Sequence, residues 1–188
     1  PTTNKHQKDV DIITKPRSTG SILKPFLYTA MLDSGELLPN TMVADIPTNY
    51  GSYQPVNFDK KYSGAVSAKL ALSKSLNVPT VRMLQKFGLE KFHDYLQKLK
   101  LKDISKSASY YGLTLALGGA ESNLWDLCKS YASMASTVNH YTENSSRYFT
   151  NEFCEPTFYA DSTIDFGEKS SEKIIFDAAS IYLTFESL

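Results

Sequence analysis

The chain has 188 residues, of which 41% are hydrophobic and 21% are charged, so it is long enough for one compact domain with a real core. Its 20 Lys and Arg residues balance 20 Asp and Glu residues, and this neutral balance disfavours a nucleic-acid-binding surface. No apolar run approaches the roughly 20 residues that span a bilayer, and no signal-peptide pattern is visible. The two cysteines, Cys128 and Cys154, have no metal-ligand spacing, and we expect neither a metal nor a cofactor.

The first third of the chain predicts one helix followed by a long loop. The β-branched run at residues 10–13 predicts either a strand or an extended lead-in. Residues 21–33, SILKPFLYTAMLD, predict a helix that Gly35 would end. Residues 40–63 are rich in Pro, Asn, Gly and Tyr, and such a composition makes turns, so we expect a long ordered loop there.

Residues 65–100 predict three further helices. Small and apolar residues recur at helical spacing from Ala65, and the sequence Asn77-Val78-Pro79 would interrupt that helix. Residues 79–88 and 89–100 predict two more helices, separated at Gly88. The last of them would bury one face, formed by Phe92, Tyr95, Leu96 and Leu99.

The rest of the chain predicts two helices and a polar, aromatic segment between them. Residues 110–119 predict an apolar loop that ends in glycine, and residues 122–138 predict an amphipathic helix with Ser122 as its N-cap. Residues 139–171 predict hairpin-like pieces, and residues 172–187 predict a closing helix. The side chains expected to point inward are Leu124, Leu127, Tyr131, Met134 and Val138 in the first helix, and Ile175, Ala178, Ala179, Tyr182 and Phe185 in the second.

Ser21 and Lys24 form the first candidate chemical site. Positions three apart share one face of a helix, so the amine of Lys24 could reach the hydroxyl of Ser21. A serine is a poor nucleophile unless a neighbour takes its proton, and a lysine can do so only if its amine is neutral. The alternative is an exposed Ser and a solvated Lys at a helix start, since Ser170 and Lys173 repeat the same spacing.

Ser75 and Asn77, in SKSLNVP, form the second candidate site. A hydroxyl and an amide two residues apart on a tight turn point the same way. The hydroxyl can relay a proton, and the amide can both donate to and accept from a peptide-like ligand. The alternative is that Asn77 merely caps the C-terminus of a helix before the Val-Pro break.

Taken together, the two elements resemble a known signature, S-x-x-K followed by an S-D-N-type element. Similarity to the transpeptidase domain of bifunctional class A penicillin-binding proteins is carried by RSTGSILKPFLY, YQPVNFDKKYSGAVSAKLALSKSLNVPTVRMLQKFG and YYGLTLALGGAESNLWDLCKSYASMAS. The stretch YYGLTLALGGAE is most similar to the 1C branch of that group. The resemblance covers about residues 9–138 and, more loosely, 172–187.

The resemblance implies a serine acyl-enzyme that cross-links peptidoglycan peptide stems and is inhibited by β-lactam antibiotics. Ser21 would be the acylated nucleophile, and its backbone N–H would supply half of the oxyanion hole. Lys24 would be the general base, and Ser75 would pass the proton to the leaving amine. Asn77 would hold the amide of the donor stem. No nucleic-acid partner is implied.

The resemblance also implies an α+β fold, that of penicillin-binding proteins and serine β-lactamases. Residues 1–188 would form its mainly helical part, with an incomplete sheet. The third family motif, K-T-G, does not occur in the chain, and we expect it on a strand after Leu188. A glycosyltransferase domain and a membrane anchor would precede this segment in the parent protein, at the periplasmic face of the inner membrane.

Two other functions stay open. A β-lactamase or β-lactam sensor would share the fold, although the contexts RSTGSILKPF and SLNVPTV are synthase-like. A non-catalytic cell-wall scaffold is the other alternative, although all four candidate site residues are present. Residues 49–57 match a family segment near the site, but we assign them no catalytic or binding role. The alternative is that they only pack on the surface. His6, His93 and His140 have no ligand spacing and are expected to be structural or on the surface.

Overall fold

The computed structural model describes residues 11–157 and 163–188, so His6 and Val10 lie outside the described residues. The helices are α1 (Lys24–Asp33), α2 (Ala68–Ser73), α3 (Asn77–Phe87), α4 (Leu89–Lys98), α5 (Ala108–Tyr111), the 3-10 helix η2 (Gly112–Leu117), α6 (Leu124–Glu143) and α7 (Ala178–Glu186). The strands are β1 (Arg17–Ser18), β2 (Met42–Asp45), β3 (Gly64–Ser67), β4 (Glu121–Ser122), β5 (Tyr148–Phe149) and β6 (Lys169–Ser170). Within the described ranges they form the antiparallel pairs β1–β4, β2–β3 and β5–β6, and this mixture confirms the predicted α+β class.

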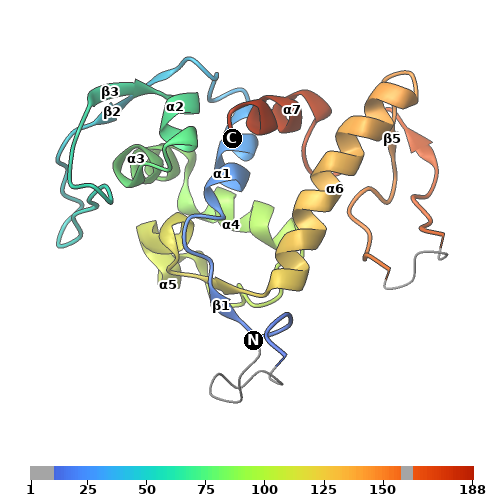
Figure 1. Cartoon of the computed structure of the whole chain (residues 1–188), viewed down its shortest axis with the longest axis horizontal. Helices are drawn as coiled ribbons and strands as arrows, with labels where there is room; N and C mark the ends of the chain where they lie inside the picture. Colours follow the sequence, from blue (N-terminus) through green and yellow to red (C-terminus); the bar gives the residue numbers. More distant parts are fainter. Residues whose placement is uncertain (1–10, 158–162) are drawn as a thin grey trace, which may run out of the picture.

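Helix α1 lies in the middle of the fold and is buried on every side (Figure 1). Residues Lys24–Leu32 are all buried, and the helix contacts α2, α3, α4 and α7. A helix that is enclosed in this way belongs to the core of a protein rather than to its surface. It ends at Asp33, after which Gly35 adopts a left-handed φ of +72°, so the predicted stop at Gly35 is confirmed.

The hydrophobic core surrounds α1. Helix α4 contributes Phe92 and Leu96, both fully buried, and Leu99 follows it, so the predicted inward face of α4 is confirmed. Leu127 and Met134 of α6 are buried as predicted, whereas Leu124 is 52% exposed. That expectation was wrong because Leu124 is the first residue of α6, which follows directly on the short strand β4 at the edge of the core.

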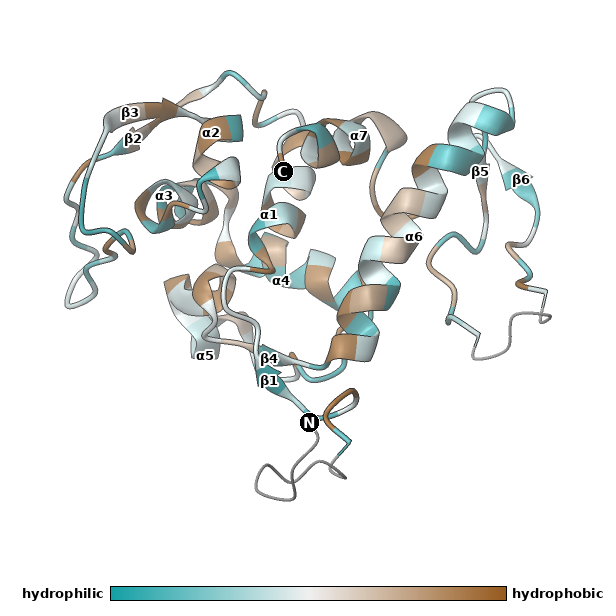
Figure 2. Cartoon of the chain, viewed as in Figure 1, coloured by the Kyte–Doolittle hydropathy of each residue, from teal (hydrophilic) through white to brown (hydrophobic). Residues whose placement is uncertain are grey.

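Residue hydropathy varies along the helices and strands. Figure 2 shows hydrophobic residues recurring along α4 and α6, while β1 and β6 are drawn in the hydrophilic colour. In the parts of the chain that the structure describes, no helix combines the length and the apolar character that a membrane crossing needs.

Several element boundaries in the first half differ from the prediction. Residues 21–23 form a turn rather than the first turn of α1, because Pro25 has no N–H and favours a helix start at this point. The predicted loop 40–63 contains strand β2, which pairs with residues 64–67. The helix expected from Ala65 therefore begins only at Ala68, since the residues before it are held in that pair.

The second half shows the same kind of difference. The Asn77-Val78-Pro79 sequence begins α3 instead of interrupting a helix, because a proline in the first helical turn costs no hydrogen bond. Residues 110–119 are largely helical rather than a loop. Asn123, not Ser122, caps α6, and that helix continues to Glu143 before the expected hairpin of β5 and β6.

Helix α7 packs against α1 and is held there by buried hydroxyl groups. Thr29 Oγ1 and Thr184 Oγ1 lie 2.8 Å apart, and Tyr28 OH lies 3.2 Å from Ser187 Oγ. The helix begins later than predicted, at Ala178, because Asp177 is its N-cap. Its expected inward residue Tyr182 is 56% exposed, so that part of the prediction was wrong.

Asp177 should contribute measurably to the stability of the fold. Its side chain accepts hydrogen bonds from Ser180 N–H at 2.8 Å and Ser180 Oγ at 2.7 Å at the start of α7. We expect Asp177→Ala to lower the free energy of unfolding by about 1 kcal/mol, because the first turn of α7 loses its cap. Asp94→Ala removes an exposed ion pair with Lys98 and serves as the control, with an expected change within about 0.5 kcal/mol. Urea unfolding at neutral pH measures both, and equal losses would contradict the capping role.

Candidate active site

Ser21 lies on a tight turn, and the segment that ends in Gly118 and Gly119 packs against the residues just before it. Gly20 has a φ of +53°, a left-handed conformation that L side chains rarely adopt. Ser18 Oγ donates to Gly118 O at 2.8 Å. A Cβ on Gly118 would lie 2.8 Å from Ser18 Oγ and 3.0 Å from the backbone of Gly20, so no larger residue fits. The segment that ends in Gly118 and Gly119 therefore packs directly on the turn that precedes Ser21.

Helix α6 supports the same turn from another direction. Tyr131 OH donates to Ile22 O at 2.7 Å, and its ring lies against Phe26 with centroids 4.7 Å apart. Burial raises the pKa of Tyr131, so its hydroxyl stays a neutral donor. Ser21 is exposed, and its hydroxyl has no hydrogen-bond partner within residues 11–157 and 163–188. The turn is thus fixed from two sides while the hydroxyl of Ser21 is left unengaged.

Lys24 is buried, and its amine meets three oxygen atoms. The residue is 3% exposed. Nζ donates to Ser75 O at 2.6 Å, to Ser75 Oγ at 3.1 Å and to Asn77 Oδ1 at 2.8 Å. Among the described residues, none of the ion pairs involves Lys24. Burial lowers the pKa of Lys24 from 10.5 to about 8, since a charged amine loses hydration there without gaining a carboxylate partner.

The second S-x-x-K sequence has a different environment. Lys173 Nζ donates to Asp33 Oδ1 at 2.6 Å, and its side chain is 41% exposed. Ser170 Oγ accepts a hydrogen bond from Glu172 N–H at 3.0 Å. The structure therefore separates the two identical motifs, and only the amine of Lys24 has the surroundings of a base.

Ser75 adopts a left-handed backbone conformation, with a φ of +51°. It follows the end of α2, where the N–H groups of Ser75 and Leu76 donate to Leu72 O at 2.8 Å and Ala71 O at 2.9 Å. This is the Schellman arrangement, in which the left-handed position is usually glycine. A serine there carries strain on the order of 1 kcal/mol. The same turn brings both oxygens of Ser75 to the amine of Lys24.

Asn77 is the first residue of α3, so the alternative that it caps the C-terminus of a helix was wrong. Its Oδ1 accepts from Lys24, and its Nδ2 donates to Val56 O at 2.9 Å. An amide group offers two donors and two acceptor sites, so one donor and one acceptor of Asn77 stay available for a ligand.

The structure adds one residue that the sequence analysis left without a role. Asn57 is 2% exposed, and its Oδ1 accepts from Asn77 N–H at 2.9 Å and from Val78 N–H at 3.1 Å. Its place in a Pro- and Asn-rich loop gave no periodic signal. The match of residues 49–57 to a family segment near the site was the only pointer to it.

Of the four predicted site residues, three are joined by side-chain hydrogen bonds and the fourth is not. Lys24, Ser75 and Asn77 form one hydrogen-bonded cluster, and Ser21 lies on the turn immediately before α1 without a hydrogen bond to it. Among the described residues, no group of three or more His, Cys, Asp or Glu side chains is placed to hold a metal ion.

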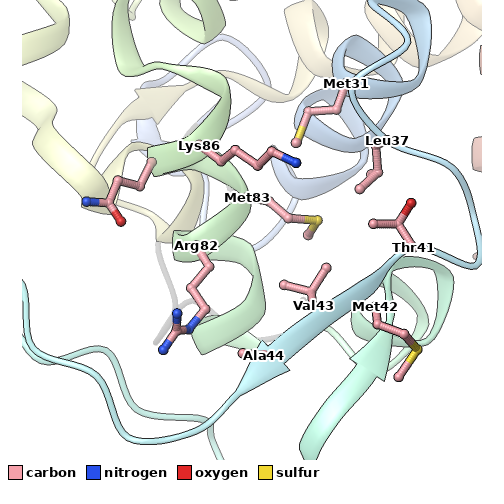
Figure 3. A pocket seen from close by; sticks show the side chains of 10 residues that line it. Met31, Leu37, Thr41, Met42, Val43, Ala44, Arg82, Met83 and Lys86 are labelled. Carbon is pink, nitrogen blue, oxygen red and sulfur yellow. The ribbon is translucent and has the colours of Figure 1, made fainter.

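A hollow of about 450 Å³ lies elsewhere, between α1, β2 and α3 (Figure 3). It is lined by Met31, Leu37, Thr41, Met42, Val43, Ala44, Arg82, Met83, Gln85 and Lys86. None of the four predicted site residues lines it, and it presents no hydroxyl next to a buried amine. We therefore place the candidate active site at the Lys24 cluster and not in this hollow.

The family model and the relatives that match this chain are those of penicillin-binding proteins. The family model described as penicillin binding protein transpeptidase domain matches residues 1–137. The chain is 37% identical over 126 residues to penicillin-binding protein 1C of Escherichia coli, which covers 67% of this chain and 16% of that protein. The chain therefore spans less than a fifth of the length of this relative.

Solved structures agree on the fold. Penicillin-binding protein 1A from Haemophilus influenzae superposes with a TM-score of 0.69 at 20% identity, over 97% of this chain and 31% of that one. The PonA1 protein from Mycobacterium tuberculosis, solved in complex with penicillin V, superposes with a TM-score of 0.61 at 20% identity, over 68% of this chain and 37% of that one.

The strain at Ser75 can be measured directly. We expect Ser75→Gly to be more stable than Ser75→Ala by about 1 kcal/mol, because both lack the hydroxyl but only glycine adopts a positive φ without cost. Ser73, the last residue of α2, provides the matched control, since alanine is there expected to be the more stable by about 0.5 to 1 kcal/mol. Urea unfolding of the four variants tests this, and the same order at both positions would contradict the left-handed strain.

Proposed function

The chain belongs to the penicillin-binding protein transpeptidase domain family, and we propose that it is the helical part of a peptidoglycan D,D-transpeptidase that works through a serine acyl-enzyme. One observation carries this proposal. The amine of Lys24 is buried without a carboxylate among the described residues, one turn after Ser21, and it contacts the two residues of the S-x-N element. That combination is what an activated serine requires.

Ser21 is the nucleophile and Lys24 its general base in this proposal. With a pKa of about 8, roughly one amine in ten is neutral at pH 7, which is enough to accept a proton as the serine attacks. Ser21 Oγ bonds to the carbonyl carbon of the penultimate D-Ala of a donor stem. The backbone N–H of Ser21 stabilises the developing oxyanion, as a preorganised donor at the point where charge builds up.

Ser75 passes the proton onward. Its hydroxyl lies 3.1 Å from Lys24 Nζ, close enough for transfer from the protonated amine to the leaving nitrogen through the hydroxyl. The bond between the two D-Ala residues then breaks, and terminal D-Ala leaves as a neutral amine. An amine of a neighbouring stem attacks the acyl-serine in the second half-reaction, and its proton returns along the same route.

Asn77 holds the donor stem. The one donor and one acceptor that its amide retains match the C=O and N–H of a peptide bond. The stem carboxylate would be held by the K-T-G strand, which we propose follows Leu188 of this chain in the parent protein. A glycosyltransferase domain and a membrane anchor would precede the segment. The parent then acts at the periplasmic face of the inner membrane on peptidoglycan stems, and β-lactams inhibit it by acylating Ser21.

A β-lactamase and a scaffold module would each differ from a transpeptidase in the same acylation assay. A β-lactamase or β-lactam sensor would also be acylated at Ser21, but a β-lactamase would release the hydrolysed drug within seconds to minutes. A scaffold module would not be acylated at all. The buried, carboxylate-free setting of Lys24 favours the catalytic function over the scaffold, because a buried amine costs stability that a scaffold has no use for.

Penicillin labelling tests the nucleophile. We expect the full-length protein that carries this segment to gain one intact benzylpenicillin per molecule, read by intact mass, and Ser21→Ala to gain none. Ser170→Ala is the matched control, since it alters the second S-x-x-K sequence and should leave labelling unchanged. Labelling of Ser21→Ala, or an unlabelled wild-type protein that melts cooperatively, would contradict the proposal.

The pH dependence tests the base. Only the neutral amine of Lys24 accepts a proton, so the acylation rate constant should rise with pH through an apparent pKa of about 8. Between pH 6.5 and pH 9 the expected increase is about 30-fold. Lys24→Arg keeps the positive charge but cannot lose its proton, and acylation should slow by a factor of about 100 or more. Stopped-flow acylation by a fluorescent penicillin measures both, and a flat wild-type profile would count against Lys24 as the base.

A further inference from the structure

Asn57 connects the loop between β2 and β3 to the candidate active site. Every hydrogen-bonding position of its side chain is used. Oδ1 accepts from the N–H groups of Asn77 and Val78 at 2.9 and 3.1 Å. Nδ2 donates to Asp45 Oδ1 at 2.7 Å and to Lys61 O at 2.8 Å. The amide can therefore lie in one orientation only, because turning it over would set its N–H groups against two backbone N–H groups.

Asp45 fixes that orientation. It is the last residue of β2 and fully buried, and its Oδ2 accepts from Ser63 N–H at 2.8 Å. Its Oδ1 accepts from Asn57. The oxygens of the Asp45 carboxylate only accept hydrogen bonds, so the Nδ2 group of Asn57 faces Asp45. The Oδ1 atom of Asn57 therefore faces α3.

The start of α3 depends on this contact. Leu76, its N-cap residue, has no side-chain oxygen with which to cap the helix. Asn57 replaces that cap from a distant part of the chain and satisfies the first two N–H groups of the helix. Val56 O accepts from the side chain of Asn77 as well. Residues 56–57 therefore fix both the backbone and the amide of Asn77.

Holding Asn77 in place also holds the amine of Lys24 in place. Asn77 Oδ1 is one of three acceptors of Lys24 Nζ, and the other two belong to Ser75, two residues earlier on the same strained turn. A catalytic group misplaced by about 1 Å can slow a reaction by about 100-fold. The line of contacts from Asp45 through Asn57 and Asn77 to Lys24 consists of hydrogen bonds between groups that are buried or partly buried.

We propose that Asn57, oriented by Asp45, is a positioning residue for the acylation of Ser21: it holds Asn77, and through it Lys24 and Ser75, in the reactive arrangement. The proposal rests on the transpeptidase function proposed above. It predicts a role for the loop between β2 and β3 that a purely surface-packing loop would not have.

The test exchanges the two side chains in the full-length protein. Asn57→Asp sets two carboxylates against each other, and Asp45→Asn sets an N–H group against either Ser63 N–H or the Asn57 amide. Each single variant should be acylated by a fluorescent penicillin about 100-fold more slowly than the wild type. In the double variant the direction is reversed: the new amide at position 45 donates to the new carboxylate at position 57, which still accepts from the start of α3. At Lys61 O the donor is replaced by a carboxylate oxygen, so this one contact becomes unfavourable, and the rate should return to within about 10-fold of wild type.

A second readout does not depend on catalysis. Amide hydrogen exchange, followed by mass spectrometry of peptides spanning residues 75–80, reports on the N–H groups of Asn77 and Val78. Exchange there should be faster in both single variants and in Asn57→Ala, and should slow again in the double variant. Asn49→Ala, an exposed asparagine in the same loop, is the control and should change neither readout.

The outcomes separate the two proposals. Slow single variants and a recovered double variant support positioning. Single variants within about 3-fold of wild type, or a folded double variant no faster than the single ones, overturn it. If the double variant does not melt cooperatively, the acylation rate of Asn57→Ala is used instead. A wild-type rate in Asn57→Ala would overturn the positioning role. If the wild-type protein is not acylated, the proposed function is wrong. If amide hydrogen exchange at residues 75–80 is also unchanged in Asn57→Ala, the positioning of Asn77 by Asn57 is wrong as well.

Discussion

The active-site region depends on one unfavourable burial, that of the Lys24 amine. A charged amine in the core must find oxygen acceptors, and here three of them come from a single turn and the helix start that follows it. The three acceptors satisfy the hydrogen-bonding groups of the amine, and because none of them is a carboxylate, burial still lowers its pKa to about 8. The same contacts thus determine how the buried amine is accommodated and how far its pKa is lowered.

The surrounding architecture makes this burial rigid. Helix α1 is enclosed by its neighbours, so the lysine at its first position cannot swing out to water (Figure 1). The turn before it is closed by the Gly118 segment on one side and Tyr131 on the other. The acceptors stand on the junction of α2 and α3, which tolerates a left-handed serine. Long-range contacts, rather than local helix propensity, therefore determine the site.

The sequence predicted the cluster of Lys24, Ser75 and Asn77 better than the boundaries of the elements. The S-x-x-K and S-x-N elements indicated Lys24, Ser75 and Asn77, and these three do meet. Their contacts join residues 51 and 53 positions apart, and they could be expected because the family resemblance links the two motifs. The start of α1, strand β2 within the predicted loop and the role of Asn57 were missed. The start of α1 follows from Pro25, whereas β2 and Asn57 depend on partners farther along the chain, residues 64–67 for β2 and α3 for Asn57. Periodicity and composition carry no information on such pairings.

The loop between β2 and β3 is closed at its base and at its tip, and residues 56–57 attach it to α3. Its base is closed where Asp45 faces Gly64, and its tip closes on itself through reciprocal hydrogen bonds between Tyr50 and Tyr53. Since lengthening a flexible loop adds little entropy cost, extra residues at Gly51 and Ser52 would be absorbed locally. A single residue inserted between Val56 and Asn57 would move one of the two contacts off Asn77. Related chains can therefore vary in length at the tip of this loop, whereas its last turn before β3 has a fixed length.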